Sequence, residues 1–108
     1  MSVAKIVVIY PRPTDVEAFE KLYLEEHMPI AQAKLKGVSK FAATKAVGTP
    51  DGSTPPFHRI AEIYFPSMQA LLDCAGSPGA QEAIAHAFSI STGGPPIVLV
   101  TEDETLAF

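Results

Sequence analysis

The residue best suited to acid–base chemistry in this sequence is His27. It follows Val16, Phe19 and Tyr23 at spacings that place all four side chains on one face of a helix. Because that face is apolar, His27 is expected to point inward rather than toward solvent. A neutral imidazole exchanges protons near neutral pH, which predicts a general acid/base in a pocket. The alternative is a core histidine bonded to a backbone carbonyl or to a tyrosine.

Glu62 is the second candidate, since it stands on a predicted strand between apolar neighbours. A carboxylate in such surroundings is costly unless it is paired, and burial would raise its pKa. We expect Glu62 to orient His27 or His58, or to act as a base itself. The alternatives are a structural ion pair with Arg59 or Lys45, or a position at a wetted edge of the sheet.

Tyrosines near these two groups are the expected contacts for a ligand. Tyr10 and Tyr64 are placed to hydrogen-bond an enolate or a phenol, although such residues often only pack while their hydroxyl reaches water. With the neighbouring aromatic and imidazole groups, the predicted substrate-binding set is Tyr10, Tyr23, His58 and Tyr64.

No metal or cofactor is expected from the remaining chemistry-bearing residues. The spacings of His27, His58 and His86 fit no pair of ligands one helical turn apart, and no cysteine assists them. Residues 93–94 are a glycine pair without the lysine or the further glycines of a phosphate loop. Residues 25–26, a glutamate doublet, indicate a solvated helix edge.

Composition places the chain among small acidic globular domains. Its 108 residues are 47% hydrophobic, with eight basic and twelve acidic side chains and a net charge of −4, which argues against nucleic acid as a partner. The apolar run at residues 6–10 is too short to span a membrane. Cys74 is the only cysteine, so a buried small side chain is favoured over a reactive thiol. We expect one cytoplasmic domain over residues 1–108.

The order of predicted elements is strand, helix, strand, strand, helix, strand. Asp15 or Thr14 can cap the first helix, which is expected to run to about His27, be disturbed at Pro29 and add a turn before Gly37. This order predicts an α+β, ferredoxin-like βαββαβ fold with a four-stranded antiparallel sheet and both helices on one face. The expected strands are residues 3–10, 38–47, 57–65 and 96–102, and the second helical region is residues 67–75 followed by a piece that restarts at 78.

The face of the sheet without helices is expected to remain substantially apolar. Alternation puts His58, Ile60, Glu62 and Tyr64 on one face of their strand, and the last strand is apolar on both faces. Since monomers rarely leave a large apolar patch in water, a homodimer with its sheets face to face is predicted. The polar groups Glu62 and His58, with Tyr10 and Tyr64, would then line a cavity between or within the sheets.

Four segments together resemble the EthD family. They are residues 23–30 (YLEEHMPI, a Tyr-x-x-x-His-x-Pro-aliphatic pattern), 60–65, 77–81 and 92–94, in that order along nearly the whole chain. The resemblance implies a dimeric α/β barrel, in a superfamily with polyketide cyclases, muconolactone isomerases and cofactor-free small monooxygenases. The chain departs from the family near residues 85–89, where an acidic residue is common and His86 stands here. That departure puts any role of the acid in doubt.

These observations predict a homodimeric, cofactor-free protein with a pocket for a small, apolar carbonyl or aromatic compound. Its chemistry would be proton transfer, such as cyclisation or isomerisation in catabolism or secondary metabolism, with His27 as general acid/base and Glu62 as its partner. An isomerase, cyclase, lyase or small monooxygenase would fit. The alternatives are a noncatalytic ligand-binding or accessory dimer that supports an oxidative degradation pathway, and a haem protein with a histidine ligand.

Overall fold

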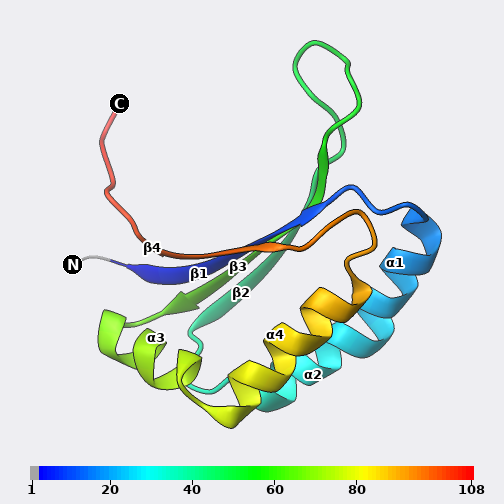
Figure 1. The fold of residues 1–108 in the computed structure, drawn as a ribbon. Helices are drawn as coiled ribbons and strands as arrows, with labels where there is room; N and C mark the ends of the chain where they lie inside the picture. The colour runs from blue at the N-terminus through cyan, green and yellow to red at the C-terminus, as the bar shows by residue number, and fades with distance from the viewer. Residues whose placement is uncertain (1–2) are drawn as a thin grey trace.

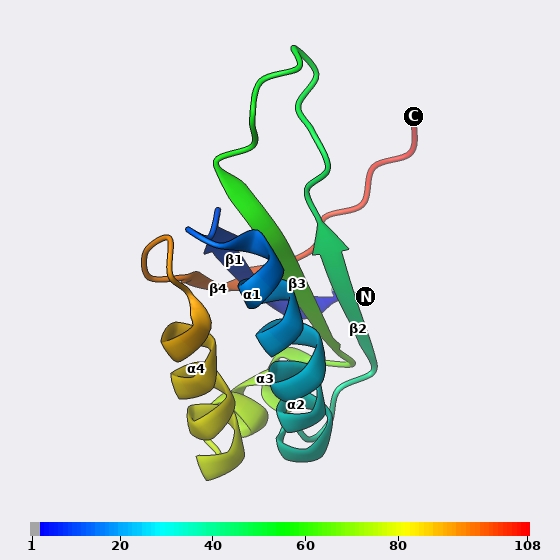
Figure 2. The same cartoon turned by 90° about the vertical axis from the view of Figure 1, so that its right-hand side faces the viewer.

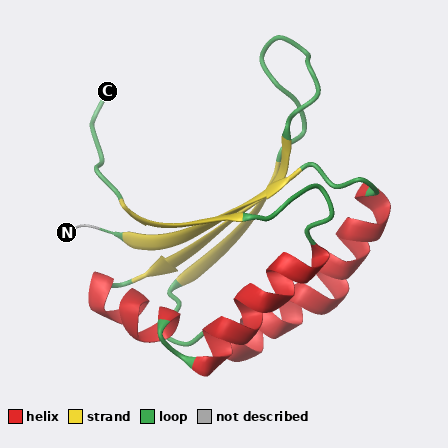
Figure 3. Ribbon diagram, viewed as in Figure 1, coloured by secondary structure: helices red, strands yellow, loops and turns green. Residues whose placement is uncertain are grey.

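A computed structural model describes residues 3–108 as an antiparallel sheet whose helices all lie on one face (Figure 1). The predicted α+β, ferredoxin-like order is confirmed, and the helical layer and the strand layer are distinct in Figure 3. The elements are β1 Ala4–Pro11, α1 Val16–Leu22, η1 Tyr23–His27, α2 Met28–Lys34, β2 Lys40–Lys45, β3 Phe57–Phe65, α3 Met68–Ala75, α4 Pro78–Ile90 and β4 Ile97–Glu102.

The strands are ordered β2-β3-β1-β4, with every neighbouring pair antiparallel. In β1, buried and half-buried side chains alternate along the strand, which is the pattern of a sheet with one covered face. Ile6 lies opposite Ile63 and Val8 opposite Ala61, so the covered faces of β1 and β3 match. β2 is shorter than predicted, Lys40–Lys45 in place of residues 38–47, and the loop that follows it projects away from the body (Figure 1).

The first helical region is continuous, and the disturbance predicted at Pro29 is a change of helix type just before it rather than an end of the first helix at His27. α1 begins after Asp15, whose side chain accepts the backbone N–H of Ala18, and it continues through η1 into α2 (Figure 2). In η1 the N–H of Met28 bonds the carbonyl of Tyr23, five residues back, which makes a wider π-helical turn. This turn precedes Pro29, which has no N–H to donate, and the chain stays helical through it.

The second helical region has the predicted break between its two pieces. Ser67 caps α3 and Ser77 caps α4, each through its side-chain oxygen. α4 packs against α2, α3 and η1. A Cβ on Gly79 would lie 2.5 Å from the carbonyl oxygen of Lys34, so glycine lets α4 approach α2 closely.

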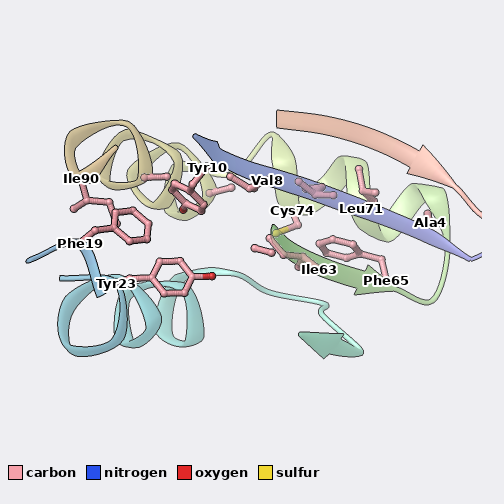
Figure 4. Close-up of a cluster of buried hydrophobic side chains, with 14 residues drawn as sticks. Ala4, Val8, Tyr10, Phe19, Tyr23, Ile63, Phe65, Leu71, Cys74 and Ile90 are labelled. Carbon is pink, nitrogen blue, oxygen red and sulfur yellow. The ribbon is translucent and has the colours of Figure 1, made fainter. Parts of the chain in front are cut away.

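The core lies between the helices and the covered face of the sheet (Figure 4). Cys74 is buried in this core as an apolar side chain, as predicted. Within residues 3–108, no helix combines the length and the apolar character needed to cross a membrane. The largest fully buried side chains are Tyr10, Tyr23, Phe19, Phe65 and Leu71.

The helix-free face carries apolar side chains, as the alternation predicted. Val7 and Ile9 on β1 and Ile60 on β3 are half-buried there. In β4, Ile97 is 42% exposed and Leu99 45% exposed. These five residues form an apolar surface on the helix-free side of the sheet, which we call the open face. It is interrupted by the paired side chains of Lys5 on β1 and Glu62 on β3.

Candidate functional site

A cavity lies between the sheet and the helices, on the covered side of the sheet. Its volume is about 40 Å³, counted over the positions open to the centre of a water molecule, and it is partly open. That is room for a few waters or for part of a small ligand, since one water needs roughly 10–15 Å³ by this measure. Its lining is Ile6, Val8, Tyr10, His27, Ala31, Leu35, Phe41, Ala61, Ile63, Ala80, Ala83, Ile84, Ala87 and Val98.

Only two side chains in this lining are polar, Tyr10 and His27. The others are aliphatic or aromatic, and the five alanines among them leave the space that larger side chains would fill. A larger groove of about 250 Å³ between α2 and β2 shares Ala31, Leu35 and Phe41 with the cavity. The arrangement is an apolar pocket with one polar end, adjoined by a groove beside α2.

The polar end continues into a chain of four hydrogen-bonded side chains. Tyr10 comes from the covered face of β1, and its Oη lies 3.3 Å from Nε2 of His27 in η1. Nδ1 of His27 lies 2.9 Å from Nδ1 of His86, which comes from α4. Nε2 of His86 lies 3.4 Å from Oε1 of Glu26. We call this set the four-residue chain.

Burial keeps Tyr10 and His27, the inner members of the four-residue chain, uncharged at neutral pH. Desolvation, with a smaller contribution from the neighbouring His86, lowers the pKa of His27 to about 4. Burial, followed by the proximity of Tyr23, raises the pKa of Tyr10 above the usual range of a phenol. His27 therefore offers one donor nitrogen and one acceptor nitrogen, and Tyr10 keeps its proton.

Tyr23 lies beside this chain without joining it. Its ring stacks against His27 with centroids 5.7 Å apart, and its hydroxyl is buried with no hydrogen-bond partner among the described residues. Burial raises the pKa of Tyr23 to about 12, although the nearby Arg59 opposes the shift. Tyr23 thus packs against the site, and its side chain is absent from the lining of the cavity.

The prediction that Glu62 orients His27 is wrong. Glu62 accepts hydrogen bonds from Nζ of Lys5 at 2.8 Å and from the Tyr64 hydroxyl at 3.1 Å, whereas the ring nitrogens of His27 meet Tyr10 and His86. The hydrogen bond from Lys5, and then that from Tyr64, lowers the pKa of Glu62, opposite to the expected rise. The cause is the register of the sheet: Glu62 pairs with Val7, whose side chain also lies on the open face.

Tyr10 and Tyr64 do not share a face, which corrects a second prediction. Tyr10 lies under the helices, and Tyr64 lies on the opposite side with Glu62. The two predicted ligand contacts therefore belong to different surfaces, and the cavity is under the helices rather than lined by Glu62, His58 and Tyr64.

His58 is also placed differently from its prediction. The register between β1 and β3 shifts at Tyr10/Pro11, and His58 and Arg59 are both buried there. Both reach Glu20 of α1: Nε2 of His58 lies 3.1 Å from Oε2, and Arg59 donates two hydrogen bonds to the same carboxylate. This cluster joins α1 to the sheet and leaves His58 outside the cavity.

Sequence reasoning missed His86 and Glu26 as parts of the site. On the sequence alone, His86 is a departure from a family pattern and a metal ligand that the spacing disfavours, and Glu26 belongs to a solvated helix edge. The available signal was that His86 lies next to Ala83 and Ala87 on the buried side of α4. What the sequence does not contain is the packing of α4 against η1, which brings the two histidines together.

The arrangement can exchange a proton with a molecule in an apolar pocket. A buried hydroxyl and a neutral imidazole present a donor and an acceptor at the polar end. Among residues 3–108, no three histidine, cysteine or carboxylate side chains cluster so as to hold a metal ion.

Comparison with known proteins identifies the family. The fold and its covered pocket define a ferredoxin-like α+β domain. The EthD domain model matches residues 11–86, and the chain belongs to the EthD family. An uncharacterised 11.0 kDa protein from the thcB–thcC intergenic region of Rhodococcus erythropolis is 31% identical over 102 residues, which cover 94% of this chain and 96% of that protein.

Solved structures share the fold at lower identity. An EthD family protein from Bacillus halodurans superposes with a TM-score of 0.85 and 22% identity, covering 94% of this chain and 99% of that one. A hydroxynitrile lyase from Passiflora edulis has a TM-score of 0.71 and 16% identity, with 97% of each chain covered. A dimeric ferredoxin-like protein from Jannaschia has a TM-score of 0.67 and 18% identity, covering 97% of this chain and all of that one.

Proposed function

We propose that this protein binds a small, apolar carbonyl or aromatic compound under its helices and catalyses a cofactor-free proton transfer on it. The observation that carries this proposal is the lining of the cavity, which is apolar except for Tyr10 and His27. A fold shared with a hydroxynitrile lyase is compatible with a lyase, isomerase or cyclase, but fold alone chooses none of them.

In this proposal the two polar side chains divide the work. The Tyr10 hydroxyl stays protonated and donates a hydrogen bond, either to His27 or to an oxygen of the bound compound. His27, neutral and with one free acceptor position when Tyr10 turns to the ligand, is the general base. The apolar walls exclude water and so strengthen both interactions.

We also propose that two copies associate through the open face, in the cytoplasm. Ile97 and Leu99 are large apolar side chains that remain exposed on this face, and a dimeric protein shares the fold. The central polar groups of that face, Lys5 and Glu62, already neutralise one another at 2.8 Å, which reduces the cost of covering them.

The test is hydrogen exchange on a probe ketone. Cyclohexanone in D₂O, followed by proton NMR, should lose its α-protons faster with the wild-type protein than in buffer. His27→Gln should lower the protein-dependent rate by about a hundredfold or more, the scale of a positioned acid/base group. His58→Gln is the matched control, because His58 is a buried histidine outside the cavity.

A noncatalytic binding protein is the second candidate, favoured by the low pKa of His27. A base with a pKa of about 4 drives proton abstraction weakly at neutral pH. If cyclohexanone shifts the resonances of cavity residues but exchanges no protons above the buffer rate, the accessory or ligand-binding function is correct and catalysis is not.

A further inference from the structure

The rings of His27 and His86 are arranged for a direct hydrogen bond between their Nδ1 atoms. Their ring planes differ by 10° and their centroids are 5.2 Å apart, while the two Nδ1 atoms are 2.9 Å apart. With the nitrogens so close and the ring centres so far apart, the rings meet edge to edge in nearly one plane. The lone pair of one nitrogen therefore points along the N–H of the other.

The outer end of the four-residue chain fixes which atoms carry protons. The Glu26 carboxylate can only accept, so Nε2 of His86 must be the donor in their contact. A neutral His86 then accepts at Nδ1, which requires His27 to donate from its own Nδ1. Nε2 of His27 is left as an acceptor, and the remaining donor is the Tyr10 hydroxyl. In each of these three hydrogen bonds, therefore, the donor lies on the cavity side and the acceptor on the solvent side.

The four-residue chain also extends from the interior of the protein to solvent. Tyr10 is fully buried and His27 is 6% exposed, whereas the Glu26 side chain is 58% exposed. Tyr10 and His27 line the cavity, so the inner end of the chain is in contact with whatever occupies it.

We propose that His27, His86 and Glu26 form a directional proton relay that connects the cavity with solvent, with Tyr10 positioning the compound at its inner end. It deepens the proposed function, because the proton to be moved is that of the bound compound. Nε2 of His27 takes a proton from the compound while the Tyr10 hydroxyl donates a hydrogen bond to the compound's oxygen. Nδ1 of His27 releases a proton to Nδ1 of His86, and Nε2 of His86 releases one to Glu26, which loses it to water.

Counting the protons in this step shows how His27 can act although its pKa of about 4 makes it a weak base. One proton leaves the compound, which becomes an anion, and one proton reaches solvent. His27 and His86 each gain one proton and lose one, and Tyr10 keeps its own, so none of the three stores a charge in the interior. A histidine that is hard to protonate can still conduct. Return of the proton along the same path resets both imidazole tautomers.

The relay is tested first without any ligand, by long-range proton–nitrogen NMR of the histidine rings in mildly alkaline buffer. We expect His27 to carry its proton on Nδ1 and His86 on Nε2. Glu26→Gln should remove this single arrangement, because an amide donates as well as accepts. Glu25→Gln, which changes the neighbouring exposed carboxylate, should leave it intact. A wild-type His27 protonated on Nε2 overturns the proposal.

The second readout is exchange of the His27 Nδ1 proton with water. His86→Phe keeps a flat ring in place but interrupts the path, and exchange should slow by about tenfold or more because it must then wait for local opening. Unchanged exchange in this variant overturns the relay. Failure of the cyclohexanone reaction with both relay readouts positive overturns only the proposed function.

Discussion

The two faces of the sheet use similar residues for different ends. Under the helices, Tyr10 and His27 stand in an apolar cavity and bond to one another. On the open face, Tyr64 and Glu62 bond to each other and to Lys5 in surroundings that are also largely apolar. The covered face has neutral polar groups beside a cavity, and the open face has paired charges. Function is therefore expected under the helices and association on the other side.

The largest expected effect concerns the open face. Leu99→Glu places a charge on each of two apposed sheets and should weaken association by more than about a hundredfold, since each 1.4 kcal/mol is a factor of about ten. Sedimentation at micromolar concentration measures this. Leu72→Glu on α3, an exposed leucine of the helical layer, is the control. A Leu99→Glu protein that still sediments as a dimer would move the interface elsewhere.

The next effect concerns the covered face and pH. The pKa of His27 is 6.5 when the chain is unfolded and about 4 when it is folded, so the unfolded chain binds more protons between these values. The free energy of unfolding should thus fall by about 3 kcal/mol as the pH drops from 6.5 to 4. Denaturant titrations of the wild type and His27→Gln measure this, and the variant should lose most of the slope. Equal slopes would mean that burial does not depress this pKa.

A smaller effect on stability distinguishes the cavity from the neighbouring cluster of Glu20, His58 and Arg59. Glu20→Gln removes the charge that faces Arg59 and His58, and should lower the free energy of unfolding by about 2 kcal/mol. The cyclohexanone reaction should be unchanged, because none of these three residues lines the cavity. Chemical denaturation checks the loss against Glu25→Gln. If Glu20→Gln abolished the reaction in folded protein, the site would extend to this cluster.

The smallest expected effect is on the free energy of unfolding, through the N-cap of the helical region that carries His27. Asp15 accepts the N–H of Ala18 at the start of α1, and Asp15→Ala should cost about 1 kcal/mol. Asp15→Asn retains a capping oxygen and should restore most of the loss. An equal loss in both variants would show that charge, rather than capping, is what Asp15 contributes.

The fold was predictable because its signals are local. Strand alternation, the serine caps and the proline and glycine breaks each act within a few residues, and together they define the βαββαβ order. The site was predictable only in part. His27 was placed correctly on the inner side of its helix by the four-residue spacing that it shares with Tyr23.

The rest depended on contacts between distant segments. Alternation sorts each strand into two sets, but the register decides which set of β1 shares a face with which set of β3. That register pairs Val7 with Glu62 and shifts at Tyr10/Pro11, so Glu62 and Tyr10 lie on opposite sides and His58 is redirected toward α1. His86 joined the site through the packing of α4 on η1, which no local pattern encodes.

Methyl NMR with a small ligand tests the contrast between the two faces most directly. In a cyclohexanone titration, the account predicts that the methyl resonances of Ala31, Ala61 and Ala87 shift together, while those of Ile97 and Leu99 stay where they are. Shifts confined to Ile97 and Leu99, with the three alanines unchanged, would place the ligand on the open face and contradict a binding site under the helices.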